Sequence, residues 1–516
     1  MDFLPDRLTP LYDAEAMRAI DRWAIEERGV DSLELMERAG AGVARAVERV
    51  VPDGPVTVVC GKGNNGGDGL VVARLLREAG RRVTVVCAAP PSEFAGDACA
   101  NLERLGGEAL LELAEDGQSA EEALAGAAVV VDALLGTGFQ GEPRGAVGEA
   151  IEAVNAAEAP VVSVDVPSGV DASTGVASGA AVRAEATVTF HAGKPGLWIA
   201  PGKAHAGEVE RIDIGIPRGA PYATTIGLIS SSVLDLLPRR GATSTKFSSG
   251  HVLVVGGSRG LTGAPRMAAQ AAMRAGAGYV TVCVPACLQE ILATAAPPEL
   301  MTKGLPDDDD GGLAPAGVAD VLEATERGGA LALGPGLGRG EGAVAFAREL
   351  AQEAKVALVL DADGLNAHAG RLGELAARAT PTVLTPHAGE LGRLLEVGSD
   401  VIERERLRHV REAAEQARAV VVLKGDDTLI ADPSGRVAVS PGGAPALATA
   451  GTGDVLTGVI AALLAAGLGP FTAAAAGVWL HAEAAREAAR GQGANEGVVA
   501  SDVIAALPAV RGGAES

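Results

Sequence analysis

The chain has 516 residues, enough for more than one hydrophobic core, and its 48% hydrophobic content excludes general disorder. A formal net charge of −23 argues against nucleic acid or an anionic membrane surface as a partner. Five scattered cysteines, and a start without a basic segment followed by an apolar core, predict a reduced cytoplasmic protein with no signal peptide.

The first half of the chain alternates strand-like and helix-like segments. Helical periodicity covers residues 13–50, with a break near residues 29–31. Short apolar strands separated by helix-length segments predict a parallel, doubly wound, Rossmann-like α/β sheet. The expected strands are Val56–Cys60, Val83–Cys87, Val129–Ala133, Val161–Val164 and Ala186–Phe190.

A stretch rich in Pro, Gly, Ser and Thr follows, and it predicts a boundary between a domain of residues 1–225 and another of residues 226–516. A second α/β series then begins. Its expected strands are His251–Val255, 280–284, Ala330–Leu333, 356–360, Thr382–Leu384 and Val420–Leu423. The apolar tract 459–480 is interrupted by Pro470 and by glycines, so it predicts two buried helices and not a membrane span.

The loop "GKGNNGGDG" at residues 61–69 satisfies the dinucleotide-binding spacing G-x-G-x-x-G. In a Rossmann dehydrogenase, an acidic residue about 20 positions later takes the ribose hydroxyls. Here Cys87, Ala88 and Ala89 stand at that place. The missing carboxylate argues against hydride transfer.

Polar residues follow three of the expected strands, and ligands bind at the carboxyl ends of the strands in an open parallel sheet. We therefore expect Asn65, Asp132, Asp165 and Ser168 to converge on one crevice, where their oxygen atoms suit a hard cation. Taken singly, each aspartate is better explained as a turn or helix cap, and it is the three loops together that favour a site.

The strongest motif in the second half is "ATAGTGDVLTG", in which Gly451, Thr452 and Gly453 precede Asp454 and an apolar helix. Backbone amides at a helix start stabilise a transferring phosphoryl group, and an aspartate there can take the proton of an attacking hydroxyl. An ordinary helix-capping aspartate is the alternative. The chain has no G-x-x-x-x-G-K-[ST] loop, so it is not a P-loop enzyme.

The motifs "GNNGGDG", "VDALLGTG" and "SVDVPSG", in this order, resemble the N-terminal half of bacterial bifunctional NAD(P)H-hydrate repair enzymes. That half is an epimerase for the R and S hydrates of NADH and NADPH. The resemblance implies a potassium ion held by Asn65, Asp132 and Ser168, and makes Asp165 the acid/base and a substrate contact. The implied phosphate and substrate contacts are Asn64, Asn65, Gly66, Gly67, Asp68, Gly136, Thr137, Gly138, Phe139, Gln140, Gly141 and Glu142.

The motifs "LALGPGLG", "VLDADGLNA", "LTPHAGE" and "VVLKGDDTLI" extend the resemblance to the ribokinase-like, ADP-dependent NAD(P)H-hydrate dehydratase over residues 246–505. It implies that Asp454 is the catalytic base and that ADP binds with Mg²⁺. The implied hydrate contacts are Ala264, Gly336, His387 and Asp454. The implied nucleotide contacts are Lys424, Gly425, Asp426, Asp427, Thr428 and Gly453.

The resemblance also implies a homo-oligomer with small-molecule substrates. The residues alone do not decide between ADP and ATP, or between the two hydrated cofactors. A ribokinase-class kinase for a vitamin-like alcohol, fused to a Rossmann-like module, is the alternative function. Two positions depart from the family pattern: Arg38 stands where Asn is usual, and Thr245 where His is common.

Overall fold

The computed structural model describes residues 7–106, 110–112 and 122–513. The chain forms two compact units, an N-terminal unit of Pro10–Ile226 and a C-terminal unit of Gly227–Ser516 together with Met1–Thr9. The chain passes between the units within β1 (Thr9–Leu11) and within β9 (Ile226–Leu228). Each unit has its own sheet and its own hydrophobic core.

The N-terminal unit is built on a parallel seven-stranded sheet in the order β4-β3-β2-β5-β6-β7-β8. The five strands predicted in this half are confirmed, whereas the edge strands β4 and β8 were not predicted. A strand at the edge of a sheet is less enclosed by neighbours than a central strand, so its apolar sequence pattern is less distinct. The strands are β2 (Val56–Cys60), β3 (Val83–Cys87), β4 (Leu110–Glu112), β5 (Val129–Ala133), β6 (Val161–Val164), β7 (Ala186–Phe190) and β8 (Glu208–Ile212).

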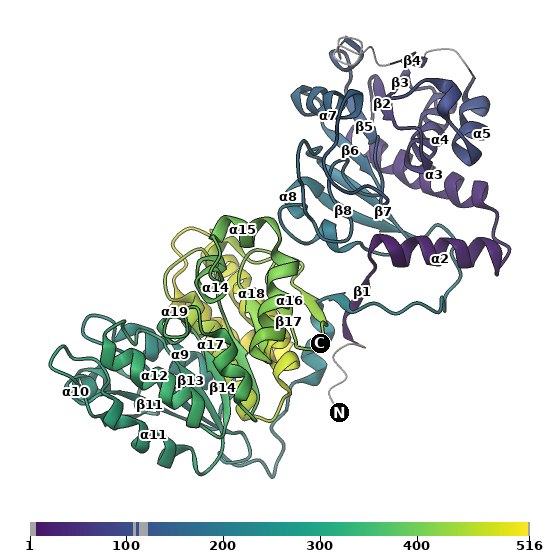
Figure 1. Ribbon diagram of the computed structural model, residues 1–516. Helices are drawn as coiled ribbons and strands as arrows, with labels where there is room; N and C mark the ends of the chain where they lie inside the picture. The colour runs from purple at the N-terminus through teal and green to yellow at the C-terminus, as the bar shows by residue number, and fades with distance from the viewer. Residues whose placement is uncertain (1–6, 107–109, 113–121, 514–516) are drawn as a thin grey trace. The chain divides into compact units, whose positions relative to one another are not determined.

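Helices cover both faces of this sheet (Figure 1). Alternate strand residues point to opposite faces, so Val58 and Val131 pack with α2, α3, α4 and α5, whereas Val59 and Val130 pack with α7. The predicted break between two N-terminal helices is confirmed. The helices are α2 (Ala14–Glu26), α3 (Ser32–Val50), α4 (Asn64–Glu78), α5 (Gly96–Leu105), α7 (Ala146–Ala156) and α8 (Lys203–Ala206).

The C-terminal unit has a longer sheet, which from β9 runs β9-β18-β17-β16-β15-β14-β13-β10-β11-β12. It is parallel from β16 to β12, and β17 and β18 are antiparallel additions that the sequence did not predict. The strands are β10 (His251–Val255), β11 (Tyr279–Pro285), β12 (Met301–Leu305), β13 (Ala330–Leu333), β14 (Ala357–Leu360), β15 (Thr382–Leu384), β16 (Val420–Leu423), β17 (Leu429–Ala431) and β18 (Val437–Val439).

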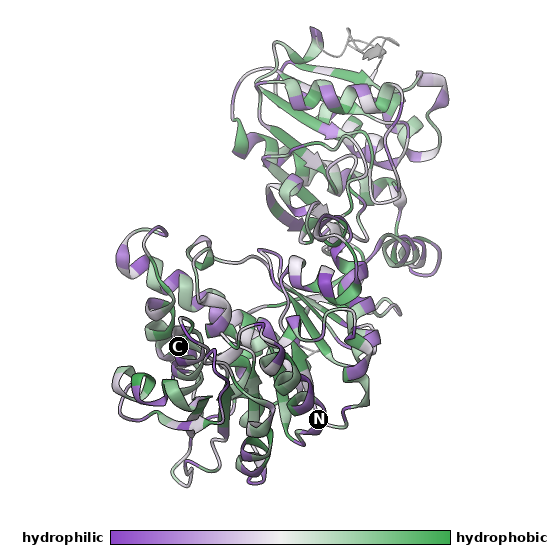
Figure 2. Ribbon diagram, turned by 60° about the vertical axis from the view of Figure 1, so that its left-hand side comes forward, coloured by the Kyte–Doolittle hydropathy of each residue, from purple (hydrophilic) through white to green (hydrophobic). Residues whose placement is uncertain are grey.

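The main core of this unit lies between the sheet and α9, α17, α18 and α19, whereas the buried residues of α12 and α16 lie outside that cluster. The strands are mostly apolar and the helices carry polar residues on their outer sides (Figure 2). The helices are α9 (Gly263–Arg274), α10 (Ala286–Ala295), α11 (Val318–Thr325), α12 (Glu341–Glu353), α13 (Asp363–Asn366), α14 (Ala388–Leu395), α15 (Ser399–Arg404), α16 (Arg406–Ala417), α17 (Thr452–Ala465), α18 (Pro470–Gln492) and α19 (Ala500–Gly512).

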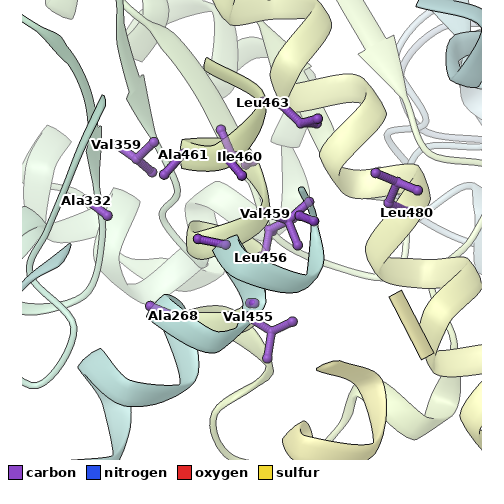
Figure 3. Packing of buried hydrophobic residues seen from close by; sticks show 14 of the residues in the cluster. Ala268, Ala332, Val359, Val455, Leu456, Val459, Ile460, Ala461, Leu463 and Leu480 are labelled. Carbon is purple, nitrogen blue, oxygen red and sulfur yellow. The ribbon is translucent and has the colours of Figure 1, made fainter. Parts of the chain in front are cut away.

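Helix α17 lies at the centre of this core, and Val455, Val459 and Ile460 project from it into the packed cluster shown in Figure 3. With α18 it forms the predicted pair of buried helices in the tract 459–480. None of the helices in the described part of the chain is long and apolar enough to span a membrane. A Cβ atom at Gly458 would lie 1.9 Å from the carbonyl oxygen of Ala268 in α9, so glycine permits the close approach of the two helices.

The substitution Gly458→Ala is expected to lower the free energy of unfolding of the C-terminal unit by about 1–3 kcal/mol, because one helix has to move away. Gly491→Ala is the matched control, since Gly491 is also helical and nothing lies within 4 Å of its added Cβ. That variant is expected to be neutral or more stable by up to about 1 kcal/mol. Urea unfolding followed by circular dichroism measures both, and equal effects would contradict the packing argument.

Candidate active sites

A cavity of 780 Å³ lies at the carboxyl ends of the strands of the N-terminal unit. Residues that follow β7, β6, β5, β2 and β3 line it, as do residues of α2 and α3. The parallel direction of the strands brings these loops to one edge of the sheet. The cavity is therefore continuous across five strand ends.

The cavity contains many, but not all, of the residues predicted for this site. The predicted residues that line it are Asn64, Asn65, Asp68, Gly136, Thr137, Gly138, Phe139 and Asp165. Gly66 and Gly67 pack inward, where added Cβ atoms would approach Gly61 and Met36. Gln140, Gly141 and Glu142 are exposed and lie outside the lining.

Asp165 follows β6 and forms a buried ion pair with Lys194, which lies beyond the end of β7. Its carboxylate also accepts hydrogen bonds from the hydroxyls of Thr137 and Thr189 and from the backbone amide of Phe190. Burial alone would raise the pKa of Asp165, but the ammonium of Lys194 and these donors outweigh it and hold the pKa below the usual value. Asp165 is therefore a carboxylate at neutral pH.

Two further carboxyl groups line the same cavity. Burial, together with the charge of Asp165, raises the pKa of Asp21 to about 6, although Lys194 opposes the shift. Burial and the charges of Asp165 and Asp21 raise the pKa of Asp68 well above its usual value, although Lys194 opposes the shift. The cavity thus holds one carboxylate that stays ionised and two groups that can carry a proton near neutral pH.

Asp132 lies at the end of β5, is fully buried, and forms no ion pair with any residue in the described ranges. Its two oxygens accept hydrogen bonds from the hydroxyls of Ser163 and Ser168, at 2.8 and 2.5 Å, and from the Ser168 amide at 2.9 Å. The hydroxyl of Ser168 and the side-chain amide of Asn65 both reach the Leu135 carbonyl oxygen. The structure thus brings the three predicted cation ligands together.

An uncompensated buried carboxylate surrounded by amide, hydroxyl and carbonyl oxygens fits a hard cation. Within the described ranges, no group of three or more His, Cys, Asp and Glu side chains is arranged to hold a metal ion. The donors around Asp132 are instead a mixture of carboxylate, hydroxyl, amide and carbonyl oxygens.

The C-terminal unit also gathers its polar residues at the strand ends. Ala264, Gly336, Asp361, His387 and Lys424 follow β10, β13, β14, β15 and β16, which are consecutive neighbours in the sheet. The Cβ of Ala264 lies 3.2 Å from the position of a Cβ built on Gly336, so these two predicted hydrate contacts are adjacent.

Lys424 connects the charged groups at this edge. Its ammonium lies 3.1 Å from Oδ1 of Asp361 and 3.6 Å from Oε2 of Glu390, and 3.6 Å from the position of a Cβ at Gly453. The other oxygen of Asp361 accepts a hydrogen bond from the Thr457 hydroxyl at 2.7 Å. Burial disfavours the charged form of Lys424, but the carboxylates of Asp361 and Glu390 outweigh burial and raise the pKa of Lys424.

Asp454 lies in the first turn of α17, one residue after Gly453. Burial and the neighbouring carboxylate of Asp361 raise the pKa of Asp454 to about 7, although Lys424 opposes the shift. A group with this pKa can both accept and donate a proton at neutral pH, as a general base requires. This geometry fits proton transfer better than simple helix capping.

His387 caps α14: its Nδ1 accepts hydrogen bonds from the amides of Gly389 and Glu390, at 3.0 and 3.3 Å. Burial lowers its pKa, so the ring is neutral at pH 7 and Nε2 carries the hydrogen. Nε2 is thus available as a donor toward a ligand.

The nucleotide loop predicted from Lys424 to Thr428 is held in shape by Arg406. The buried guanidinium of Arg406 binds the carboxylate of Asp427 at 3.0 Å and the carbonyl oxygen of Lys424 at 3.2 Å. The Asp426 carboxylate accepts a hydrogen bond from the amide of Gly443. Asp426 and Asp427 therefore shape the loop from within it.

Of the two departures from the family pattern, Arg38 borders the N-terminal cavity and Thr245 lies in an exposed turn. The guanidinium of Arg38 binds Glu34 and the carbonyl oxygen of Ile214, and Arg38 does not line the cavity. Thr245 forms a local exposed turn with Ser248.

Sequence reasoning missed Lys194, Asp21, Asp361 and Arg406. Asp361 directly follows β14, so the rule that identified Asp165 could have found it, whereas Lys194 lies in the loop beyond β7. Asp21 lies on α2 and Arg406 on α16, and neither carries a strand-end signal.

Comparisons with known proteins cover nearly the whole chain. A family model described as NAD(P)H-hydrate dehydratase matches residues 252–509, and one described as YjeF-related protein N-terminus matches residues 32–196. The bifunctional NAD(P)H-hydrate repair enzyme Nnr of Moorella thermoacetica is 43% identical over 97% of this chain and 96% of its own length. The enzyme of the same name from Escherichia coli is 34% identical over 96% of this chain and 93% of its own.

One similar solved structure is the ADP/ATP-dependent NAD(P)H-hydrate dehydratase from Bacillus subtilis, co-crystallized with ATP/Mg²⁺. It is 30% identical, covers 55% of this chain and 96% of its own, and superposes with a TM-score of 0.47.

Replacing Lys194 with methionine leaves the Asp165 carboxylate buried without its cation, so we expect the N-terminal unit to lose about 3–5 kcal/mol of stability at pH 7. In the wild type, the lowered pKa of Asp165 contributes stability above the unfolded-state value, and this is lost as the pH falls. Without Lys194, burial raises that pKa. The difference in stability between the wild type and Lys194→Met should therefore become smaller from pH 8 to pH 5. Thermal unfolding midpoints at each pH measure this difference.

Lys62→Met is the control, because it breaks the exposed ion pair between Lys62 and Glu93 and should cost less than about 1 kcal/mol. If the loss of stability in Lys194→Met does not change with pH, its cause is lost packing and not an uncompensated charge.

Proposed function

This chain belongs to the family of bifunctional NAD(P)H-hydrate repair enzymes, and we propose that each of its two units performs one of the two repair steps. The N-terminal unit interconverts the R and S hydrates of NADH and NADPH. The C-terminal unit dehydrates the S hydrate at the expense of ADP and releases AMP and phosphate. The 43% identity over 97% of the chain is the observation that carries this proposal.

In the N-terminal unit, epimerisation requires one proton to be delivered to the departing hydroxyl and one to be taken from the incoming oxygen. Asp165 is the proton acceptor, since Lys194 keeps it ionised. Asp21, with a pKa of about 6, is suited to donate the other proton from α2. The amides at the start of α4 face the same cavity and suit the phosphates of the substrate.

Asn65, Asp132 and Ser168 are the residues that would hold a potassium ion. Such an ion, when bound, supplies a positive charge that compensates the buried carboxylate of Asp132. The Ser168 hydroxyl donates a hydrogen bond to Asp132 and accepts one from the Leu135 amide, and the Thr137 hydroxyl donates one to Asp165. These bonds keep the loop after β5 beside Asp165.

In the C-terminal unit, Asp454 takes the proton of the ring hydroxyl, whose oxygen attacks the terminal phosphorus of ADP as the bond to AMP breaks. The resulting phosphate ester then eliminates phosphate, which is a far better leaving group than hydroxide. Loss of a ring proton restores the nicotinamide double bond. The amides at the start of α17 face the transferring group, and Lys424 neutralises its charge.

The nucleotide would enter with Mg²⁺, which, when bound, shields the charge of its phosphates. The loop from Lys424 to Thr428, braced by Arg406, is suited to hold the nucleotide. A cytoplasmic location and a homo-oligomeric state stay predictions from the sequence.

The two activities can be separated by Asp165→Asn and Asp454→Asn. With a mixture of R and S NADH hydrates and ADP, the wild type should restore all of the absorbance of reduced nicotinamide. We expect Asp165→Asn to stop at the S fraction, and Asp454→Asn to restore none while still interconverting the hydrates. The rate of epimerisation in Asp165→Asn and the rate of dehydration in Asp454→Asn should each fall at least about 10²-fold, the usual contribution of an acid/base group.

The reaction products distinguish the repair enzyme from the alternative, a ribokinase-class kinase. Such a kinase would leave a stable phosphorylated alcohol and would not restore the absorbance. AMP formation from ADP, measured by chromatography in step with absorbance recovery, is the expected result. Absence of recovery with both ADP and ATP would contradict the proposed function.

The dehydratase rate with pure S hydrate should rise with pH through about 7, because Asp454 acts as a base only when it is deprotonated. Asp361→Asn should shift this profile to lower pH, since it removes the charge that raises the pKa of Asp454 and leaves Lys424 free to lower it. Initial rates between pH 5.5 and 8.5 measure the shift. A profile unchanged in Asp361→Asn would show that another group controls the rate.

A further inference from the structure

The cavity of the N-terminal unit poses an electrostatic problem for its ligand. Five acidic side chains and three basic ones line it, yet a dinucleotide carries a negatively charged diphosphate. The acidic residues are Asp21, Asp68, Glu93, Asp97 and Asp165, and the basic residues are Arg18, Lys62 and Lys194. Backbone amides carry only partial charges, so an available cation beside them would strengthen the binding of the diphosphate.

Two of the three basic side chains are already neutralised. Lys194 is buried against Asp165, and the ammonium of Lys62 lies 2.8 Å from Glu93. Arg18, by contrast, forms neither an ion pair nor a side-chain hydrogen bond with any residue in the described part of the chain. It is the one basic residue of the lining whose charge is not already matched by those residues.

Arg18 also lies where a diphosphate is expected. It shares the cavity-facing side of α2 with Met17, Asp21 and Ile25. Its Nη1 atom lies 3.8 Å from the position of a Cβ built on Gly138, in the loop that follows β5.

The start of α4 faces the same cavity through Asn64 and Asn65, and no side chain caps that helix. A guanidinium and a helix N-terminus therefore border one space, an arrangement that suits an anion.

We propose that Arg18 binds the diphosphate of the hydrated dinucleotide and makes the N-terminal unit select dinucleotides over hydrated mononucleotides. The choice of substrate rests on the proposed function, whereas the choice of Arg18 rests on the charges of the cavity. The planar guanidinium forms paired hydrogen bonds to phosphate oxygens, which a lysine ammonium does not reproduce. A substrate with a single phosphate at its end would leave this contact unused.

The test compares Arg18→Ala and Arg18→Lys with Arg22→Ala in the full-length protein. Arg22 is a matched control, because it is exposed on the same helix, carries the same charge and lies outside the cavity lining. The probe is ADP-ribose, which contains the diphosphate but no nicotinamide ring. Hydrogen exchange of the α2 and α4 amides reports its binding at this site alone, even if the probe also binds the other unit.

We expect Arg18→Ala to weaken ADP-ribose binding 10- to 100-fold, as loss of a charge-assisted contact implies. Arg18→Lys should recover part of the affinity, and Arg22→Ala should match the wild type. The preference in kcat/KM for the hydrate of NADH over that of reduced nicotinamide mononucleotide should fall in Arg18→Ala by a similar factor.

Equal binding by Arg18→Ala and Arg22→Ala would overturn the proposal and make Arg18 a solvated surface residue. Failure of the proposed function would look different. In that case even the wild type would not interconvert the hydrates, although the dependence of ADP-ribose binding on Arg18 would persist.

Discussion

The parallel direction of the strands is the constraint on which both units depend. A parallel sheet places the carboxyl ends of all its strands on one edge, so residues far apart in the chain become neighbours there. Asp132, at the end of β5, and Asp165, after β6, lie on neighbouring strands of the N-terminal sheet, and His387 and Lys424 follow neighbouring strands of the C-terminal one. Without this common direction, neither set of polar side chains would meet. The apolar strands are thus what makes the polar edge possible.

Both edges use the same electrostatic arrangement. In each, a buried carboxylate that follows one strand pairs with a lysine that follows another: Asp165 with Lys194, and Asp361 with Lys424. In each, a further partly buried carboxyl group lies close by, and its pKa is raised to about 6 or about 7. Burial is the main cause of both shifts, and within each pair the carboxylate adds to the rise in pKa whereas the lysine opposes it. The fold itself therefore provides a group that exchanges protons near neutral pH. This is the kind of group that a proton-transfer step at a hydroxyl requires.

The family and the two-step function predicted from the motifs are confirmed by the full-length relatives, whereas the roles of single residues stay predictions. A strand-end motif identified Asp165, and the glycines before an apolar helix identified Asp454, because both patterns are local in the sequence. Lys194 was missed although it follows a strand, because a lone lysine in a loop has no distinctive spacing. Asp21 was missed because it reaches its cavity from a helix, and helical periodicity does not tell which sheet edge that helix covers.

The amino-acid sequence alone determined the two α/β units, the eleven main strands and the loops that carry the chemistry. The spacing of apolar residues and the glycine-rich turns are local features, which can be recognised within a few residues of sequence. Only the tertiary structure decided which side chains share a dry environment, and hence which carboxyl groups stay ionised. The pKa of Asp21 or Asp454 depends on burial and on charges tens to hundreds of residues away in the chain. Coulomb interactions act through space and not along the chain, so these values exist only once the sheet has brought the charges together.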